Sequence, residues 1–125
     1  MPSMVYYDMS DAAGVMYHAE YIQLMARART EALKTVGFDI AGLAQLGVIF
    51  VVKNVAINYK KAIPFGVEVV VESDVSWPSR VRMLWRQRIV SAKVGVGATA
   101  EIEVVCVNAQ FKPMPVPDEI FHAIQ

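Results

Sequence analysis

The hydrophobic pattern of this chain changes its period once, and that change limits the folds available to it. From about Tyr17 to Val36, apolar residues recur at steps of three and four, as on one face of an α-helix. From Ile49 onward, apolar and polar residues alternate, as in strands that bury one face. The sequence therefore predicts one long helix followed by several strands.

The predicted helix has an apolar face, a polar face and a defined end. Arg27, Glu31 and Lys34 occupy the polar face. Gly37 is suited to cap the C-terminus, because glycine adopts left-handed backbone angles at little cost. The apolar face, which is expected to pack on the sheet, consists of Tyr17, Tyr21, Leu24, Met25, Ala28, Ala32 and Val36.

Several segments alternate in the manner of strands and are separated by residues that favour turns. The expected strands span 49–59, 67–75, 81–89 and 98–107, and residues 4–7 are a further candidate. The expected interruptions are a loop at 39–47, a turn at 62–66, a break at 77–79 and a glycine hairpin at 95–97. Three prolines end the sheet, and Asp118-Glu119 are expected to open a short last helix.

This order of elements predicts an α+β fold in one domain over residues 1–125. Short connections cannot make parallel crossovers, so the strands are expected to pair antiparallel. One helix covers one face of such a sheet and leaves its edges free, and pairing with a second copy is the usual remedy. A homodimer is therefore expected.

Composition and charge argue against several classes of protein. Hydrophobic residues make up 55% of the chain, which suits a folded core, and 12 basic residues balance 12 acidic ones, which gives no attraction toward nucleic acid. No apolar run approaches the roughly 20 residues of a membrane helix. The first twenty residues hold no Lys or Arg, unlike a secretory signal, and the single Cys106 suits a reducing compartment. A cytoplasmic location without a membrane span is expected.

The most specific pattern lies near the N-terminus. Residues 7–21 read Tyr-Asp-Met-Ser-Asp-Ala-Ala-Gly-Val-Met-Tyr-His-Ala-Glu-Tyr, and residues 27–31 read Arg-Ala-Arg-Thr-Glu. Further matching stretches are Phe50-Val51-Val52, Ile57-Asn58-Tyr59, Val105-Cys106-Val107 and Lys112-Pro113. Together they resemble the 4-hydroxybenzoyl-CoA thioesterase family, and within it the Tol-Pal-associated acyl-CoA thioesterase branch.

The resemblance implies a hotdog fold, in which an antiparallel sheet wraps around one long central helix. It also implies assembly as dimers or dimers of dimers, and hydrolysis of acyl-CoA thioesters without a metal or another cofactor. Five positions depart from the family pattern. Glu20 stands where Asn or Ser is common, Ala26 where Glu is common, Val67 where an acidic residue is common, and Met9 and Ser10 where Asp or Glu and Thr are frequent.

Thioester hydrolysis needs a base or nucleophile, a donor for the developing oxyanion and a pocket for the acyl group. By resemblance, Asp11 supplies the first, either by direct attack on the carbonyl carbon or by activating a water. The backbone N–H of His18 supplies the second by the same resemblance, and Gly14 lets the turn approach a substrate closely. Asp11 also suits a turn or capping role, but its context favours catalysis.

Other residues around this turn have open roles. The side chain of His18 either positions the site or packs in the core. Tyr17 is expected in the core or the pocket wall, and Glu20 in the first helical turn, where negative charge is stabilising. A Ser-His-Asp triad lacks a Gly-x-Ser-x-Gly setting, and a metal site is not expected, because the two histidines are far apart and cysteine occurs once.

A row of arginines follows one predicted strand, where Arg80, Arg82, Arg86 and Arg88 share the same parity. The row either meets the phosphates of CoA or pairs with acidic residues of the neighbouring strands as a neutral solvent face. Acidic runs on both sides favour pairing for most of it. The candidates for phosphate binding are Arg80, Ser79, Lys60 and Lys61.

Three functions fit these features. The first is acyl-CoA hydrolysis, and the second is hydrolysis of a thioester carried by an acyl carrier protein at the same site. The third is a protein that binds an acyl thioester or a partner protein with little turnover. A dehydratase is disfavoured, because no His-Asp or His-Glu arrangement lies outside the thioesterase-like turn. The acyl group itself is not specified by the sequence.

Overall fold

The computed structural model describes residues 1–4, 18–64 and 66–124. The elements are β1 (Pro2–Met4), α1 (His18–Thr35), α2 (Ile40–Gln45), β2 (Ile49–Tyr59), β3 (Glu68–Ser79), β4 (Arg82–Ser91), β5 (Gly95–Val107) and α3 (Asp118–Ala123). The expected order of strand, long helix, four strands and short last helix is confirmed, and α2 is an addition. Of the candidate strand at 4–7, only Met4 is described, and it belongs to β1.

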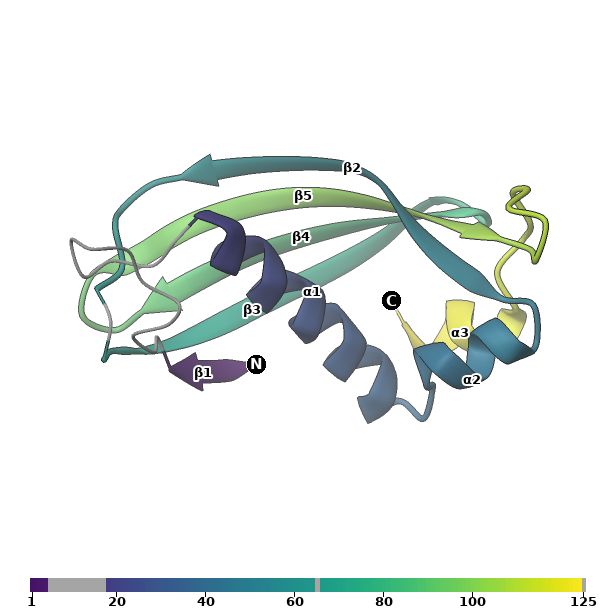
Figure 1. Ribbon diagram of the computed structural model, residues 1–125, viewed down its shortest axis with the longest axis horizontal. Helices are drawn as coiled ribbons and strands as arrows, with labels where there is room; N and C mark the ends of the chain where they lie inside the picture. Colours follow the sequence, from purple (N-terminus) through teal and green to yellow (C-terminus); the bar gives the residue numbers. More distant parts are fainter. Residues whose placement is uncertain (5–17, 65, 125) are drawn as a thin grey trace.

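The strands form one antiparallel sheet in the order β1-β3-β4-β5-β2. Helix α1 lies across one face and contacts β3 and β4, while α2 and α3 lie at the end away from β1 (Figure 1). The expected α+β class, with an antiparallel sheet wrapped around one long helix, is confirmed. The eleven-residue β2 forms one edge of the sheet.

Helix α1 buries the face that its spacing predicts, with one error at its end. Among the predicted positions, Tyr21, Leu24, Met25 and Ala28 are buried, whereas Val36 is 39% exposed. The helix ends at Thr35, so Val36 leaves the helical face. The N–H groups of Gly37 and Phe38 donate to the carbonyls of Lys34 and Leu33 at 3.0 and 2.8 Å, with Gly37 at a φ of 92°, which closes the helix as a Schellman motif.

Two predicted interruptions are wrong, and a third is displaced, because the hairpin expected at 95–97 turns at 92–94 and Gly95 and Gly97 lie in β5. The loop expected at 39–47 contains α2, which Asp39 caps by accepting a hydrogen bond from the N–H of Gly42 at 3.3 Å. The break expected at 77–79 does not occur, because β3 continues to Ser79. Pro78 is tolerated there because the pairing with β4 shifts register between Ser76 and Ser79, so its missing N–H costs no ladder bond.

The inner faces of β4 and β5 complete the core. The buried positions of β4 alternate as predicted, with two polar side chains, Gln87 and Ser91, among the apolar residues. Strand β5 starts earlier than expected, at Gly95 rather than Ala98, and its buried positions alternate from Ala98 onward. The core positions on these strands are Met83, Trp85, Ile89, Ala98, Ala100, Ile102, Val104 and Cys106.

Gly97 lies in β5 at a point where a side chain has no room. A Cβ at this position would lie 2.3 Å from Cδ1 of Ile63, which is fully buried. We expect Gly97→Ala to lower the free energy of unfolding by about 1–3 kcal/mol, because overpacking displaces a buried side chain. Urea unfolding followed by circular dichroism measures the change.

The matched variant is Ile63→Val, which removes the Cδ1 atom and so relieves the shorter of two close contacts, the other being Cγ1 at 2.7 Å from the same Cβ. In the wild-type background it costs about 0.5–1.5 kcal/mol. In the Gly97→Ala background it is expected to cost less or to raise stability. Additive effects of the two changes would contradict the clash.

Candidate active site

The predicted catalytic turn lies mostly outside the described residues. Asp11, Gly14 and Tyr17 belong to that part, and the structure describes the backbone of His18 as the first residue of α1. The first N–H groups of a helix have no intrahelical partner and carry partial positive charge. The expected oxyanion donor, the backbone N–H of His18, therefore lies at a helix start.

The beginning of α1 packs beside the end of β2. The ring of Tyr21 meets the ring of Tyr59 edge-on, with centroids 5.1 Å apart. Burial raises the pKa of Tyr21, and a hydrogen bond with the backbone of Ile63 partly offsets this effect. Glu20 lies half-buried in the first turn, as expected. The helix start is thus held at the Tyr59 end of the edge strand.

Two candidates for phosphate binding, Lys60 and Lys61, follow β2 directly at this end. Both side chains are exposed, and both backbone N–H groups donate to the carbonyl of Gly97, at 2.8 and 3.1 Å. These bonds fix the backbone of the lysine pair against β5. The flexible side chains remain available to an anion on the same end of the molecule as the start of α1.

The other two candidates, Ser79 and Arg80, lie in a different place. Ser79 pairs with Arg82 on β4, Arg82 pairs with Val105 on β5, and Val105 pairs with Val51, near the beginning of β2. Along β2, Val51 is separated from Tyr59 by roughly 25 Å, at about 3.3 Å per residue. Within one chain, the structure therefore does not bring the two pairs of candidates together.

Arg80 is already engaged by α3. It lies in the turn between β3 and β4 rather than on the strand face that its parity predicted. Its guanidinium forms an ion pair with Asp118, lies 4.1 Å from the ring centroid of Phe121, and donates to the carbonyl of Val116 at 3.4 Å. Ser79 accepts a hydrogen bond from the N–H of Val81 at 3.3 Å.

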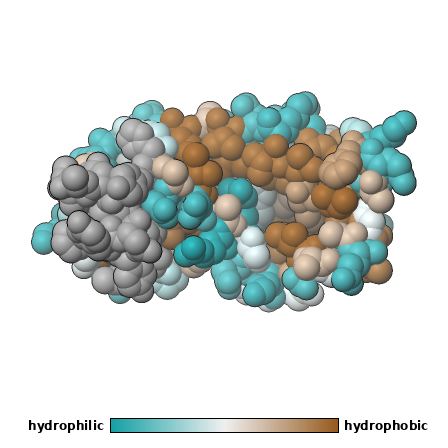
Figure 2. Space-filling view, viewed as in Figure 1, coloured by the Kyte–Doolittle hydropathy of each residue, from teal (hydrophilic) through white to brown (hydrophobic). Residues whose placement is uncertain are grey.

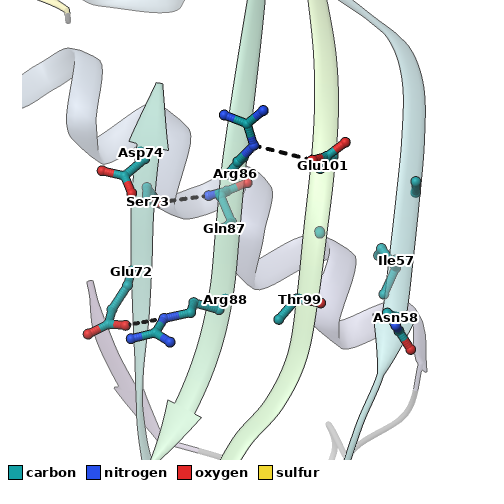
Figure 3. Close-up of a pocket in the computed structure, with 12 residues that line it drawn as sticks. Ile57, Asn58, Glu72, Ser73, Asp74, Arg86, Gln87, Arg88, Thr99 and Glu101 are labelled. Carbon is teal, nitrogen blue, oxygen red and sulfur yellow. Dashed lines mark hydrogen bonds and ion pairs between the residues drawn. The ribbon is translucent and has the colours of Figure 1, made fainter. Parts of the chain in front are cut away.

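The rest of the arginine row forms cross-strand ion pairs, as the acidic runs on both sides predict. Arg88 pairs with Glu72 at 2.5 Å, and Arg86 pairs with Glu101 at 3.2 Å, on the face of the sheet away from α1 (Figure 3). Arg82 pairs with Glu103 at 3.0 Å. A hollow of about 870 Å³ lies on this outer face. Its charges largely neutralise one another.

A polar cluster that the sequence analysis missed lies beneath α1. Nε2 of Gln87 donates to the carbonyl of Met25 at 2.9 Å and to Oγ of Ser73 at 3.0 Å, the second of which is visible in Figure 3. Oε1 of Gln87 accepts a hydrogen bond from Arg29 at 2.8 Å. The available signal was a glutamine at the parity that places Met83, Trp85 and Ile89 in the core.

A second, smaller cavity adjoins this cluster, with a volume of about 130 Å³. Arg29 forms part of its wall, and the remaining wall is almost entirely apolar. The space-filling view shows hydrophobic surface gathered along β2 and toward α2, beside the hydrophilic surface of α1 (Figure 2). The other lining residues come from α1, α2, β2, β4 and β5 and are Ala26, Thr30, Leu33, Ile40, Phe50, Val52, Met83, Trp85 and Val104.

Residues 1–4, 18–64 and 66–124 contain neither a group of potential metal ligands nor a helix that could span a membrane. Within these ranges, no three His, Cys, Asp or Glu side chains are grouped so that they would hold a metal ion. In the same ranges, no helix has both the length and the apolar character that crossing a bilayer requires.

Solved structures of thioesterases share this architecture. A 1,4-dihydroxy-2-naphthoyl-CoA thioesterase from Synechocystis superposes with a TM-score of 0.93 at 20% identity, covering 99% of this chain and 93% of that one. The DHNA-CoA thioesterase from Staphylococcus aureus gives a TM-score of 0.89 at 28% identity, covering 98% and 85%. The fold is the hotdog fold of these thioesterases.

Sequence comparison identifies the family. A model of the thioesterase-like superfamily matches residues 6–124. The acyl-CoA thioesterase YbgC of Haemophilus influenzae is 36% identical over 129 residues, covering 99% of this chain and 94% of the relative. The acyl-CoA thioester hydrolase YbgC of Escherichia coli O6:H1 is 33% identical over 120 residues, covering 95% and 90%. The chain belongs to the thioesterase-like superfamily, and the resemblance seen in its N-terminal pattern is confirmed.

The ion pair between Arg80 and Asp118 makes the packing of α3 against the turn between β3 and β4 weaken at low pH. The hydrogen bond and the charge of Arg80 hold the pKa of Asp118 below its ordinary 3.8. The stability that this carboxylate contributes is therefore present above pH 3.8 and is lost as pH falls through the lowered pKa. We expect the stability gap between wild type and Asp118→Asn to be constant near neutral pH and to shrink below pH 3.8. Urea unfolding at a series of pH values, followed by tryptophan fluorescence, measures this gap, and a gap that widens in acid would contradict the pairing.

Proposed function

We propose that this chain hydrolyses acyl-CoA thioesters to a free acid and CoA, with Asp11 as the catalytic carboxylate. The observation that carries the proposal is the likeness to the Haemophilus influenzae acyl-CoA thioesterase, at 36% identity over 99% of this chain. The Asp-Ala-Ala-Gly-Val-Met-Tyr-His sequence before α1 supports the same function, because it supplies a carboxylate and a helix start in one short stretch.

In the proposed reaction, the bond between the acyl carbon and sulfur breaks, an oxygen takes the place of the sulfur, and water supplies the OH and the H that the two products gain overall. Asp11 either removes the proton of the attacking water or attacks first and forms an anhydride that water then opens. In both routes the thiol of CoA leaves with a proton and the acyl group becomes a carboxylic acid. The backbone N–H of His18 stabilises the transient oxyanion, and one such donor contributes about 3 kcal/mol.

The remaining residues of the turn position these two groups. Gly14 leaves room for the substrate beside the backbone, because it carries no Cβ. Tyr17 forms part of the pocket wall, and the side chain of His18 holds the turn in place. A charged imidazole is disfavoured at a helix start, which supports a positioning role over acid-base chemistry.

A homodimer formed through β2 reconciles the distant candidates for phosphate binding. The apolar side chains of this edge strand include Val51, Val52, Val55 and Tyr59, each 37–46% exposed. Antiparallel pairing of two copies of β2 places the Tyr59 end of one beside the Ile49 end of the other. Lys60 and Lys61 of one protomer then lie at the same end of the joined sheet as Ser79 and Arg80 of the second, with β5 and β4 between the two pairs, and the pairs contact different phosphates of one CoA. Pairing of two such dimers gives the expected dimer of dimers.

The first test replaces the proposed carboxylate. Asp11→Asn is expected to lower kcat on an acyl-CoA by at least about 100-fold, because general base catalysis contributes that much or more. Release of the CoA thiol, followed with a thiol reagent, measures the rate. The matched control is Asp39→Asn, which changes the same chemical group at the cap of α2, where Asn serves equally well. A folded Asp11→Asn protein with most of the wild-type turnover would exclude the proposed role.

The second test concerns the edge strand. Val55→Lys places a charge on β2 and is expected to shift the dimer toward monomer by at least tenfold in dissociation constant, because an edge charge opposes strand pairing. Size-exclusion chromatography with light scattering over a dilution series measures the shift. Val70→Lys is the matched control, since Val70 is similarly exposed but lies on β3, away from the edge. Equal effects of the two substitutions would rule out β2 as the interface.

A further inference from the structure

Arg29 is a half-buried cation between α1 and the sheet, and within residues 1–4, 18–64 and 66–124 it has no matching anion. Its side chain donates to Oε1 of Gln87 at 2.8 Å, which is a neutral acceptor. Among the described residues, no carboxylate lies within ion-pair distance of its guanidinium. Burial lowers the pKa of Arg29, as expected where a charge is removed from water. An enclosed charge is costly unless an anion compensates it.

The surroundings orient the half-buried guanidinium toward the sheet. Gln87 is 2% exposed, and its Nε2 is already committed to the carbonyl of Met25 and to Ser73. Its Oε1 is therefore directed at Arg29. One acceptor uses only part of a guanidinium, which carries five N–H donors. No second acceptor is found in the part of the chain that the structure describes, so the other donors are open to a group that enters from outside.

The small cavity provides the place for such a group. Arg29 lines it together with the apolar side chains of Phe50, Met83 and Trp85. Its volume of about 130 Å³ equals the space of roughly four water molecules, at about 30 Å³ each. This space holds a carboxylate with one or two methylene groups. An apolar pocket with a single charged group at its wall is the usual design of a selective small-molecule site.

The cavity opens beside the edge strand. Two of its lining residues, Val52 on β2 and Ile40 on α2, are 46% and 38% exposed. Along α1, Arg29 lies roughly 16 Å from His18, at about 1.5 Å per residue, which is too far for a short acyl group within one protomer. In the antiparallel β2 pair, however, the cavity of one protomer faces the helix start of the other. A short acyl group attached at that thioester reaches it.

We infer that Arg29 binds a negatively charged group at the far end of a short acyl chain, so that this enzyme selects monothioesters of short dicarboxylic acids. The inference rests on the proposed acyl-CoA hydrolysis and adds the class of acyl group. A carboxylate on the guanidinium forms charge-assisted hydrogen bonds, about twice as strong as neutral ones, and compensates the enclosed charge. An unbranched acyl group of equal length leaves the guanidinium uncompensated.

The experiment compares glutaryl-CoA with hexanoyl-CoA, which have similar length and differ in the terminal charge. We expect a higher kcat/KM for glutaryl-CoA in the wild-type protein. Arg29→Met is expected to lower the ratio of the two kcat/KM values at least tenfold. Arg27→Met is the matched control, because Arg27 lies two residues away on the exposed face of α1 and is expected to leave the ratio unchanged.

A second pair of variants covers the case in which Arg29→Met does not fold. Ala26 lines the same cavity one helical turn before Arg29, so Ala26→Glu places a carboxylate beside the guanidinium. It is expected to lower the glutaryl to hexanoyl ratio by about tenfold. Ala26→Gln fills the same space without the charge and is expected to slow both substrates alike. Equal ratios in the two variants would overturn the inference.

The outcomes separate this inference from the proposed function. If hexanoyl-CoA is hydrolysed and Arg29→Met does not change the glutaryl to hexanoyl ratio of kcat/KM, the role of Arg29 is overturned. The proposed thioesterase activity is unaffected by that result. No turnover of any acyl-CoA removes the proposed function, and binding then decides the inference. Calorimetry with Asp11→Asn protein then compares the binding of glutaryl-CoA and hexanoyl-CoA. The inference is supported if glutaryl-CoA binds more tightly and Arg29→Met abolishes the difference. Equal binding of the two overturns it. If the guanidinium pairs with a carboxylate of the second copy, Arg29→Met dissociates the dimer and the ratio stays constant, which also overturns it.

Discussion

The burial of one face of α1 in the curve of the sheet is the constraint on which the rest of the structure depends. Leu24 and Met25 have no exposed surface, and the inner positions of β3, β4 and β5 close around them. Fully burying a side chain of this size contributes about 1.5–3 kcal/mol. Because the helix is fixed along its length, its start is held at the Tyr59 end of β2 and its later turns cover the small cavity. One packing interface thus positions both parts of the proposed site.

Much of the fold follows from the periodicity of the sequence, and the exceptions have physical causes. The run rich in Val and Ile at 49–59 gives β2 its bounds, and four of the helical positions are buried as expected. Helix α2 has only six residues, too few for a helical period to be distinguished from a loop. The continuation of β3 through Pro78 depends on a register shift that involves another strand, so no local pattern reports it.

The site was accessible to sequence reasoning only in part. A capping aspartate and a catalytic one have the same local pattern, so Asp11 was singled out by its resemblance to a family and not by spacing. Lys60 and Arg80 could not be placed relative to each other, because alternation does not give the order of strands in a sheet. To predict the contact between Arg29 and Gln87, one would need to know that Gln87 points inward from β4 and which face of α1 is turned toward it. That combination arises only from packing.

Helix α2 is a segment in which related proteins of this fold can change the shape of the small cavity. None of its residues is buried, yet one of them, Ile40, helps to form the mouth of the cavity beside Arg29. Substitutions or length changes in this segment therefore alter the depth of the cavity without loss of core packing. In evolution, new acyl preferences can arise here through mutations that are nearly neutral for stability, while the turn before α1 retains its chemistry.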